Sequence, residues 1–148
     1  SLHAARSGAL HRVFVVLSDG ECDEGTTWEA ALFGAHHGLA NLCAVVDYNG
    51  IQSFGRVDSV LKLEPFVDKW RAFGWHTIEI DAHSLPEVIG ALETIRSDKI
   101  KRPIAVIARS VKGKGVSFME NRPDWHNRMP NEEQIAQARR ELGIESAG

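Results

Sequence analysis

The sequence predicts an α/β fold: a doubly wound, mostly parallel sheet with helices on both of its faces. Two observations support this prediction. Short runs rich in β-branched and aliphatic residues have the length and composition of buried strands, and amphipathic helical patterns separate them. Such alternation is typical of a parallel sheet that helices cover on both faces. The expected strands are residues 12–17, 42–47, 75–81 and 103–108.

The first two helices are predicted from apolar residues that recur at helical spacing. Gly38 is the expected end of the first helix, which follows the first strand. The second helix is expected to begin at Pro65, because proline is favoured at the first helical position, and to end at Gly74. The residues of the two apolar stripes are Trp28, Ala31, Leu32 and Ala35 in the first helix and Phe66, Trp70 and Phe73 in the second.

The last two helices are predicted from their capping residues. Ser84 is the expected N-cap of the third helix, and Glu87 is its expected capping-box partner. Asn131 is expected to cap the fourth helix. Its first turn would hold Glu132 and Glu133, where the helix dipole favours acidic side chains.

Composition limits the classes of function. The 148 residues suffice for a single domain over residues 1–148, and the absence of an initiator Met leads us to expect that its N-terminal end is incomplete. The formal charge of −3 indicates neither a nucleic-acid nor a membrane partner. No apolar run is long enough for a membrane span, and no signal peptide is recognised. Only Cys22 and Cys43 are present, which favours reduced thiols in the cytoplasm.

Polar residues follow the first two expected strands at the point where each strand ends. Asp19 follows the first strand and Asn49 follows the second. Adjacent strands would bring the two side chains together, and their oxygens are hard ligands suited to Mg²⁺ or Ca²⁺. Gly20 would let the backbone approach a phosphate. The alternative is that both are turn residues that bond only to their own backbone.

Several segments together resemble the N-terminal half of bacterial transketolases, especially those split into two subunits. Ser18-Asp19-Gly20 followed by Asp47-Tyr48-Asn49-Gly50-Ile51 is similar to the thiamine diphosphate fingerprint. The longer matches are ECDEGTTWEAA, NGIQ, KWRAFGW and VKGKGVSFMEN followed by WH. The resemblance runs from about Arg12 to the last helix and implies the thiamine diphosphate-binding fold.

The resemblance implies a role for each matching residue at the strand ends. The side chains of Asp19 and Asn49 and the backbone carbonyl of Ile51 would bind Mg²⁺ or Ca²⁺. Gly20 and Glu21 would lie against the diphosphate of thiamine diphosphate. Ser18 departs from the fingerprint, which has glycine at this position, but the ligand Asp19 is retained.

Three further residues receive catalytic roles from the resemblance. Glu24 and Glu29 match acids of a polar network between the two active sites of a transketolase dimer. His126 matches a histidine that reaches the diphosphate and the substrate hydroxyls, and such a side chain can shuttle a proton. The alternatives are exposed first-turn acids and a surface loop histidine. Asn127 stands where the family usually has glycine.

Two lysines in the glycine-rich loop, Lys112 and Lys114, have two possible roles. They can balance phosphate charge, or they can be solvated loop residues. The family's pyrimidine-activating glutamate lies in a separate domain that this sequence does not contain.

We therefore expect the diphosphate- and Mg-binding half of a transketolase, a transferase that moves a two-carbon ketol unit from a ketose phosphate to an aldose phosphate. It would act only with a C-terminal pyrimidine-binding subunit, in a homodimer or heterotetramer. The alternatives are another thiamine diphosphate enzyme, of the 2-oxo acid dehydrogenase or deoxyxylulose-phosphate synthase type, and a catalytically incomplete binding or assembly module.

Overall fold

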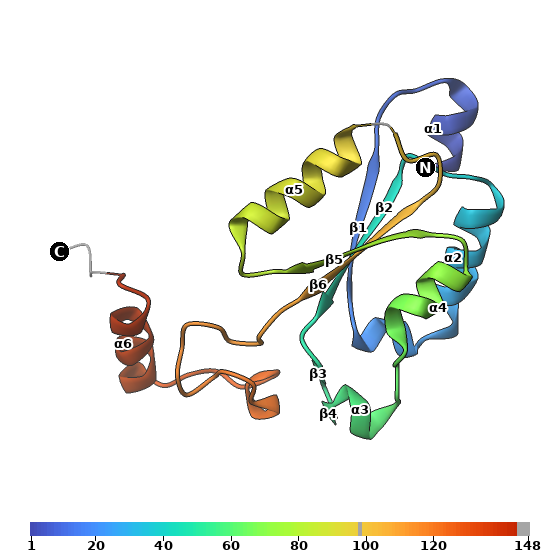
Figure 1. The fold of residues 1–148 in the computed structure, drawn as a ribbon. Coiled ribbons are helices and arrows are strands. Elements are labelled where there is room, and N and C mark those ends of the chain that lie inside the picture. The colour runs from blue at the N-terminus through green and yellow to red at the C-terminus, as the bar shows by residue number, and fades with distance from the viewer. Residues whose placement is uncertain (98, 145–148) are drawn as a thin grey trace.

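A parallel sheet of four strands forms the centre of the molecule (Figure 1). The structure, a computed structural model, describes residues 1–97 and 99–144. The strands lie in the order β1-β2-β6-β5 and every pair is parallel. Each predicted strand is present, with ends within one residue of the prediction. Their bounds are β1 Val13–Ser18, β2 Leu42–Tyr48, β5 His76–Asp81 and β6 Ile104–Arg109.

Helices cover both faces of this sheet, as predicted (Figure 1). Helices α2 (Gly25–His36) and α4 (Phe66–Ala72) pack on one face, where Ala31 and Trp70 share a core with Ile107. Helix α5 (Leu85–Arg96) packs on the other face. The chain adds strands in one direction from β1 to β5 and then turns back to β6. Right-handed crossovers therefore place α5 opposite the other two helices.

Strand β1 departs from the prediction of a buried strand. It lies at the edge of the sheet and, among the described residues, pairs with β2 alone. Three of its central side chains remain exposed: Phe14 by 50%, Val15 by 39% and Val16 by 72%. The run is apolar on both faces, as in a central strand, but among its apolar side chains Leu17 is the one that packs against the core shared with α2 and α4 in the described part of the chain.

The capping predictions have different outcomes. At α6 (Glu132–Glu141), Asn131 accepts from the backbone N–H of Gln134 at 2.9 Å and a full capping box forms, so this prediction is confirmed. Ser84 is the N-cap residue of α5, but its side chain makes no capping bond. The capping box with Glu87 is therefore wrong. The Glu87 carboxylate accepts from the backbone N–H of Asp81 at 2.8 Å instead, which ties α5 to the end of β5.

Short elements that the periodicity does not predict surround the carboxyl end of the sheet and the N-terminus. Each has six residues or fewer, too few for an apolar repeat to show. They are α1 Leu2–Ser7, η1 Gly20–Asp23, β3 Ile51–Gln52, β4 Gly55–Arg56, α3 Val57–Val60 and η2 Pro123–Trp125.

The C-terminal helix α6 stands apart from the sheet (Figure 1). Its attachment is to the loop after β6, where Glu141 accepts from both the backbone N–H and the hydroxyl of Ser117 at 2.6 Å. Within the described part of the chain, no helix has the length and apolar character needed to cross a membrane.

Candidate metal and diphosphate site

The carboxyl ends of β1 and β2 open into a single hollow of about 400 Å³. Ser18 and Asp47 are register partners at these ends, so the residues that follow them lie side by side. All but one of the predicted site residues line this hollow. The ones that do are Asp19, Gly20, Glu21, Glu24, Asn49, Ile51 and His126.

Asp19 is a fully buried carboxylate with one unused oxygen. None of its surface is exposed. Its Oδ2 accepts from the backbone N–H of Gly50 at 2.6 Å, whereas its Oδ1 is buried and has no hydrogen-bond partner among the described residues. Burial raises the pKa of Asp19, and this outweighs the N–H groups of Gly50 and Gly20, which lower it. A bound cation would satisfy the unused oxygen and favour the charged carboxylate.

The turn after β2 holds Asn49 beside this carboxylate. Its Oδ1 accepts from the backbone N–H of Ile51 at 2.9 Å, and its Nδ2 donates to Oδ2 of Asp47 at 3.2 Å. Gly50 has a φ of +75°, a left-handed conformation that a glycine adopts without strain. This conformation lets the Gly50 N–H reach Asp19, so the turn at Asn49 and Gly50 also connects the two strand ends.

The donor set at this position fits a hard divalent cation that is shared with a phosphate. Among residues 1–97 and 99–144, no group of three or more His, Cys, Asp or Glu side chains could hold a metal. The strand-end site instead offers one buried carboxylate, the amide oxygen of Asn49 and the carbonyl of Ile51. Mg²⁺ is commonly held by one or two carboxylates and completes its shell with water and phosphate oxygens.

The turn after β1 is built differently from the fingerprint. Ser18 and Glu21 bond to each other reciprocally: the Glu21 carboxylate accepts from the Ser18 backbone N–H at 2.7 Å, and the Glu21 N–H donates to the Ser18 hydroxyl at 3.2 Å. Ser18 thus stabilises the turn, although it also occupies the N–H of Glu21. A Cβ on Gly20 would lie 3.0 Å from Cβ of Gln52, which is tighter than side chains normally pack.

His126 reaches the same hollow from a distant part of the sequence. It follows η2, and its Nε2 lies 3.0 Å from Oγ of Ser53 in the β3–β4 turn. The side chain is exposed. It lines the same hollow as Asp19, where it can contact a bound molecule.

The remaining predicted residues divide between the hollow and the outer surface. Glu24 is the N-cap residue of α2 and lines the hollow, whereas Glu29 is exposed on α2 and does not. Glu24 therefore lies just before α2 and not in its first turn, where the sequence placed it. Lys112 lines the hollow, but Lys114 points to Glu120 at 3.7 Å. The structure thus brings Glu24 and Lys112 to the candidate site and leaves the other two outside it.

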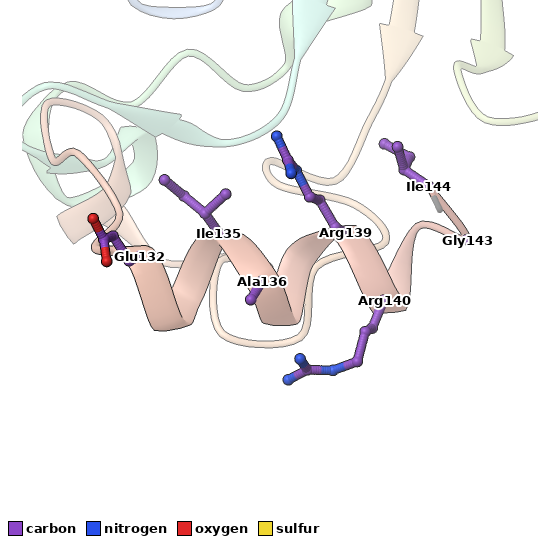
Figure 2. A pocket seen from close by; sticks show the side chains of 7 residues that line it. All are labelled: Glu132, Ile135, Ala136, Arg139, Arg140, Gly143 and Ile144. Atoms are coloured by element: carbon purple, nitrogen blue, oxygen red, sulfur yellow. The ribbon is translucent and has the colours of Figure 1, made fainter. Parts of the chain in front are cut away.

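A larger hollow of about 570 Å³ lies along α6, away from the strand ends (Figure 2). The side chains of Ile135 and Arg139 project to the same side of the helix in Figure 2. None of the predicted site residues lines it. It is an open helix face rather than a site in which polar groups converge. The lining residues are Glu132, Ile135, Ala136, Arg139, Arg140, Gly143 and Ile144.

The sequence matches the family model for the transketolase thiamine diphosphate binding domain over residues 5–148. This chain belongs to the transketolase family. The match covers every residue of the strand-end site. The fold and the thiamine diphosphate-binding class expected from the resemblance are therefore confirmed.

Two relatives of this transketolase-family chain are named as transketolase subunits. It is 41% identical to a 6-deoxy-6-sulfo-D-fructose transketolase subunit of Clostridium sp. over 135 residues, which is 91% of this chain and 49% of that protein. It is 37% identical to an apulose-4-phosphate transketolase subunit of Actinobacillus succinogenes over 142 residues, which is 96% of this chain and 51% of that protein. The chain spans about half the length of these relatives.

A solved transketolase shares the fold. The structure superposes on the transketolase of Campylobacter jejuni with a TM-score of 0.86 and 26% sequence identity, over 93% of this chain and 21% of that one. The arrangement of the sheet and its helices is thus the arrangement of the transketolase family.

Some polar residues at the candidate site were not predicted. Asp47 and Ser53 line the hollow, and Ser110 donates its hydroxyl to Asp47. Asp47 had a signal in the sequence, because it lies at a strand end two residues before Asn49. Ser53 and Ser110 had none, because their proximity to the site depends on the loop paths and on the pairing of β2 with β6.

Proposed function

We propose that this chain supplies the metal- and diphosphate-binding half of a transketolase. The observation that supports this most directly is the unused, buried Oδ1 of Asp19 beside the Asn49 turn. A buried carboxylate oxygen without a partner costs free energy, and a divalent cation is the ligand that offsets this cost. Asp19, Asn49 and the carbonyl of Ile51 would hold Mg²⁺ or Ca²⁺.

When bound, thiamine diphosphate supplies the carbanion chemistry of ketol transfer. The residues of this chain bind and orient the charged end of the cofactor. Gly20 keeps the backbone close to the diphosphate, and Lys112 at the wall of the hollow offsets its negative charge. His126 would contact the diphosphate and exchange a proton with a substrate hydroxyl, using the ring nitrogen that now faces Ser53.

The complete enzyme would require a second subunit. The relatives from Clostridium and Actinobacillus are named as subunits, which supports a partner that binds the pyrimidine ring. We propose a homodimer or heterotetramer, with Glu24 and Glu29 at the interface between two active sites. The donor and acceptor would be sugar phosphates. Cys22 and Cys43 are free and buried, which is compatible with the cytoplasmic location that we propose.

The test is ketol transfer by the full-length protein combined with its C-terminal subunit, Mg²⁺ and thiamine diphosphate. We expect transfer from xylulose 5-phosphate to an aldose phosphate and no turnover of pyruvate. Pyruvate turnover would identify a 2-oxo acid enzyme or a deoxyxylulose-phosphate synthase instead. Cofactor binding without ketol transfer to any aldose would indicate the binding or assembly module and would overturn the proposal.

A further inference from the structure

We propose that Asp47 is a positioning residue that selects which end of the Asn49 carboxamide faces the metal. This inference rests on the proposed function. Its basis is a single contact: Oδ2 of Asp47 accepts a hydrogen bond from Nδ2 of Asn49 at 3.2 Å. None of the roles implied by the family resemblance falls on Asp47.

Both oxygens of Asp47 are engaged, so its role is indirect. While Oδ2 accepts from Asn49, Oδ1 accepts from the hydroxyl of Ser110. Ser110 is itself held, because its backbone N–H donates to the carbonyl of Tyr48 at 3.2 Å. Asp47 is thus fixed between the ends of β2 and β6 and acts on the site through Asn49 rather than as a ligand.

The physical reason lies in the asymmetry of a carboxamide. Only its oxygen can bind a cation, whereas its NH₂ group is a donor that a cation repels. An ionised carboxylate only accepts hydrogen bonds, so Asp47 stabilises the orientation in which Nδ2 of Asn49 faces it. The Asn49 oxygen then faces away from Asp47. It accepts from Ile51 and retains a second lone pair for a metal.

The first experiment measures Mn²⁺ affinity by electron paramagnetic resonance in the full-length protein with thiamine diphosphate. We expect Asp47→Ala to weaken Mn²⁺ binding by about 10- to 100-fold, the range for partners of metal ligands. Asp47→Asn should restore most of the loss, because its side-chain oxygen can still accept from Nδ2 of Asn49. Glu93→Ala, an exposed position on α5 with the same change in charge, is the matched control and should bind normally.

A second experiment separates positioning from simple charge attraction. A carboxylate at position 49 presents an equivalent oxygen in either orientation and needs no selection. In an Asn49→Asp background, Asp47→Ala should therefore cost no Mn²⁺ affinity. If Asp47 acted through its negative charge alone, the loss would be the same in both backgrounds. Equal losses would overturn the proposal.

The Mn²⁺ affinity of the unsubstituted protein distinguishes failure of the proposed function from failure of the Asp47 role. If the unsubstituted protein binds no Mn²⁺ with thiamine diphosphate, the proposed function fails and the role of Asp47 fails with it. If the unsubstituted protein binds Mn²⁺ and Asp47→Ala binds it equally well, only the positioning role is overturned. Thermal unfolding of each variant shows whether it is folded when the affinity is measured.

Discussion

At the scale of single residues, Asp19 combines two properties that oppose stability in the absence of a ligand. It is a carboxylate with no exposed surface, and one of its oxygens has no partner among the described residues. A buried charge without full hydrogen bonding is costly, and such groups are found mainly where they serve a site. The fold keeps this destabilising carboxylate where the ends of β1 and β2 meet, and Asn49 and Ile51 lie at the same place.

We expect Asp19→Asn to remove metal-dependent cofactor binding without unfolding the chain. The amide can still accept from the Gly50 N–H, while the buried charge is gone. Calorimetry with Mg²⁺ and thiamine diphosphate should show affinity reduced by more than about 100-fold, beyond the effect of an outer-shell partner. Asp68→Asn, an exposed carboxylate on α4, is the control. Unchanged cofactor affinity in Asp19→Asn would refute the anchor role.

At the scale of elements, Glu64 connects α4 to the carboxyl end of the sheet. Its carboxylate accepts from the Phe66 backbone N–H at 2.8 Å, from the Tyr48 hydroxyl at 2.8 Å and from Arg109 at 3.3 Å. Arg109 also pairs with Glu79 on β5 and stacks 4.2 Å from the centre of the Tyr48 ring. The group therefore joins β2, β5, β6 and the start of α4.

These bonds make the contribution of Glu64 depend on pH. The Phe66 N–H, followed by the Tyr48 and Arg109 hydrogen bonds, lowers the pKa of Glu64 in the folded state below its ordinary value of 4.5. Its stabilisation is therefore present above the unfolded pKa and is lost as pH falls through the lower folded pKa. Glu64→Gln should lower the free energy of unfolding by up to about 1 kcal/mol at neutral pH. This is the upper end of the range for ion pairs that are partly exposed to solvent. The free energies of unfolding of the two proteins, measured with urea, should converge at acidic pH. A difference between them that does not change with pH would contradict the prediction.

The exposed edge of β1 is the second feature at this scale. An apolar strand with one open edge is a template for pairing with another chain. Val16→Lys should therefore reduce self-association of the 148-residue chain, measured by sedimentation velocity, and change its unfolding free energy by less than about 0.5 kcal/mol. Val60→Lys, an exposed valine on α3, should leave association unchanged. Equal effects of the two substitutions would show that charge, not the strand edge, controls association.

At the scale of the whole molecule, the candidate site is assembled from segments that are far apart in sequence. The turn after β1, the turn after β2 and the loop that holds His126 meet around one hollow. The contact between His126 and Ser53 joins positions separated by 73 residues. The parallel sheet creates this arrangement, because the carboxyl ends of its strands share one edge.

We expect His126→Ala to reduce ketol transfer by the assembled enzyme roughly 100- to 10,000-fold, the usual range for a group that transfers a proton. Mg²⁺ affinity should be unchanged, because His126 is not among the residues that would hold the metal. His36→Ala, an exposed histidine on α2, is the control. Loss of Mg²⁺ affinity in His126→Ala would show that the histidine supports the site structurally instead.

Local sequence was sufficient for the strands, for the principal helices and for Asp19, Asn49 and their turns. Strand and helix periodicity are properties of neighbouring residues, and an Asn-Gly pair encodes its own turn. The failed cap at Ser84 shows the limit of such signals. Glu87 matched the capping pattern, but the end of β5 offered its carboxylate a different donor.

The tertiary structure alone decided the exposure of β1, the partnership of Asp47 with Ser110 and the approach of His126 to Ser53. Each depends on the order of strands or on the path of a long loop, and neither is encoded in the spacing of residues along one element. Composition determined which side chains can bind a metal and a phosphate. The pairing of β1 with β2 determined that these side chains face one another, because hydrogen bonding between strands aligns their ends.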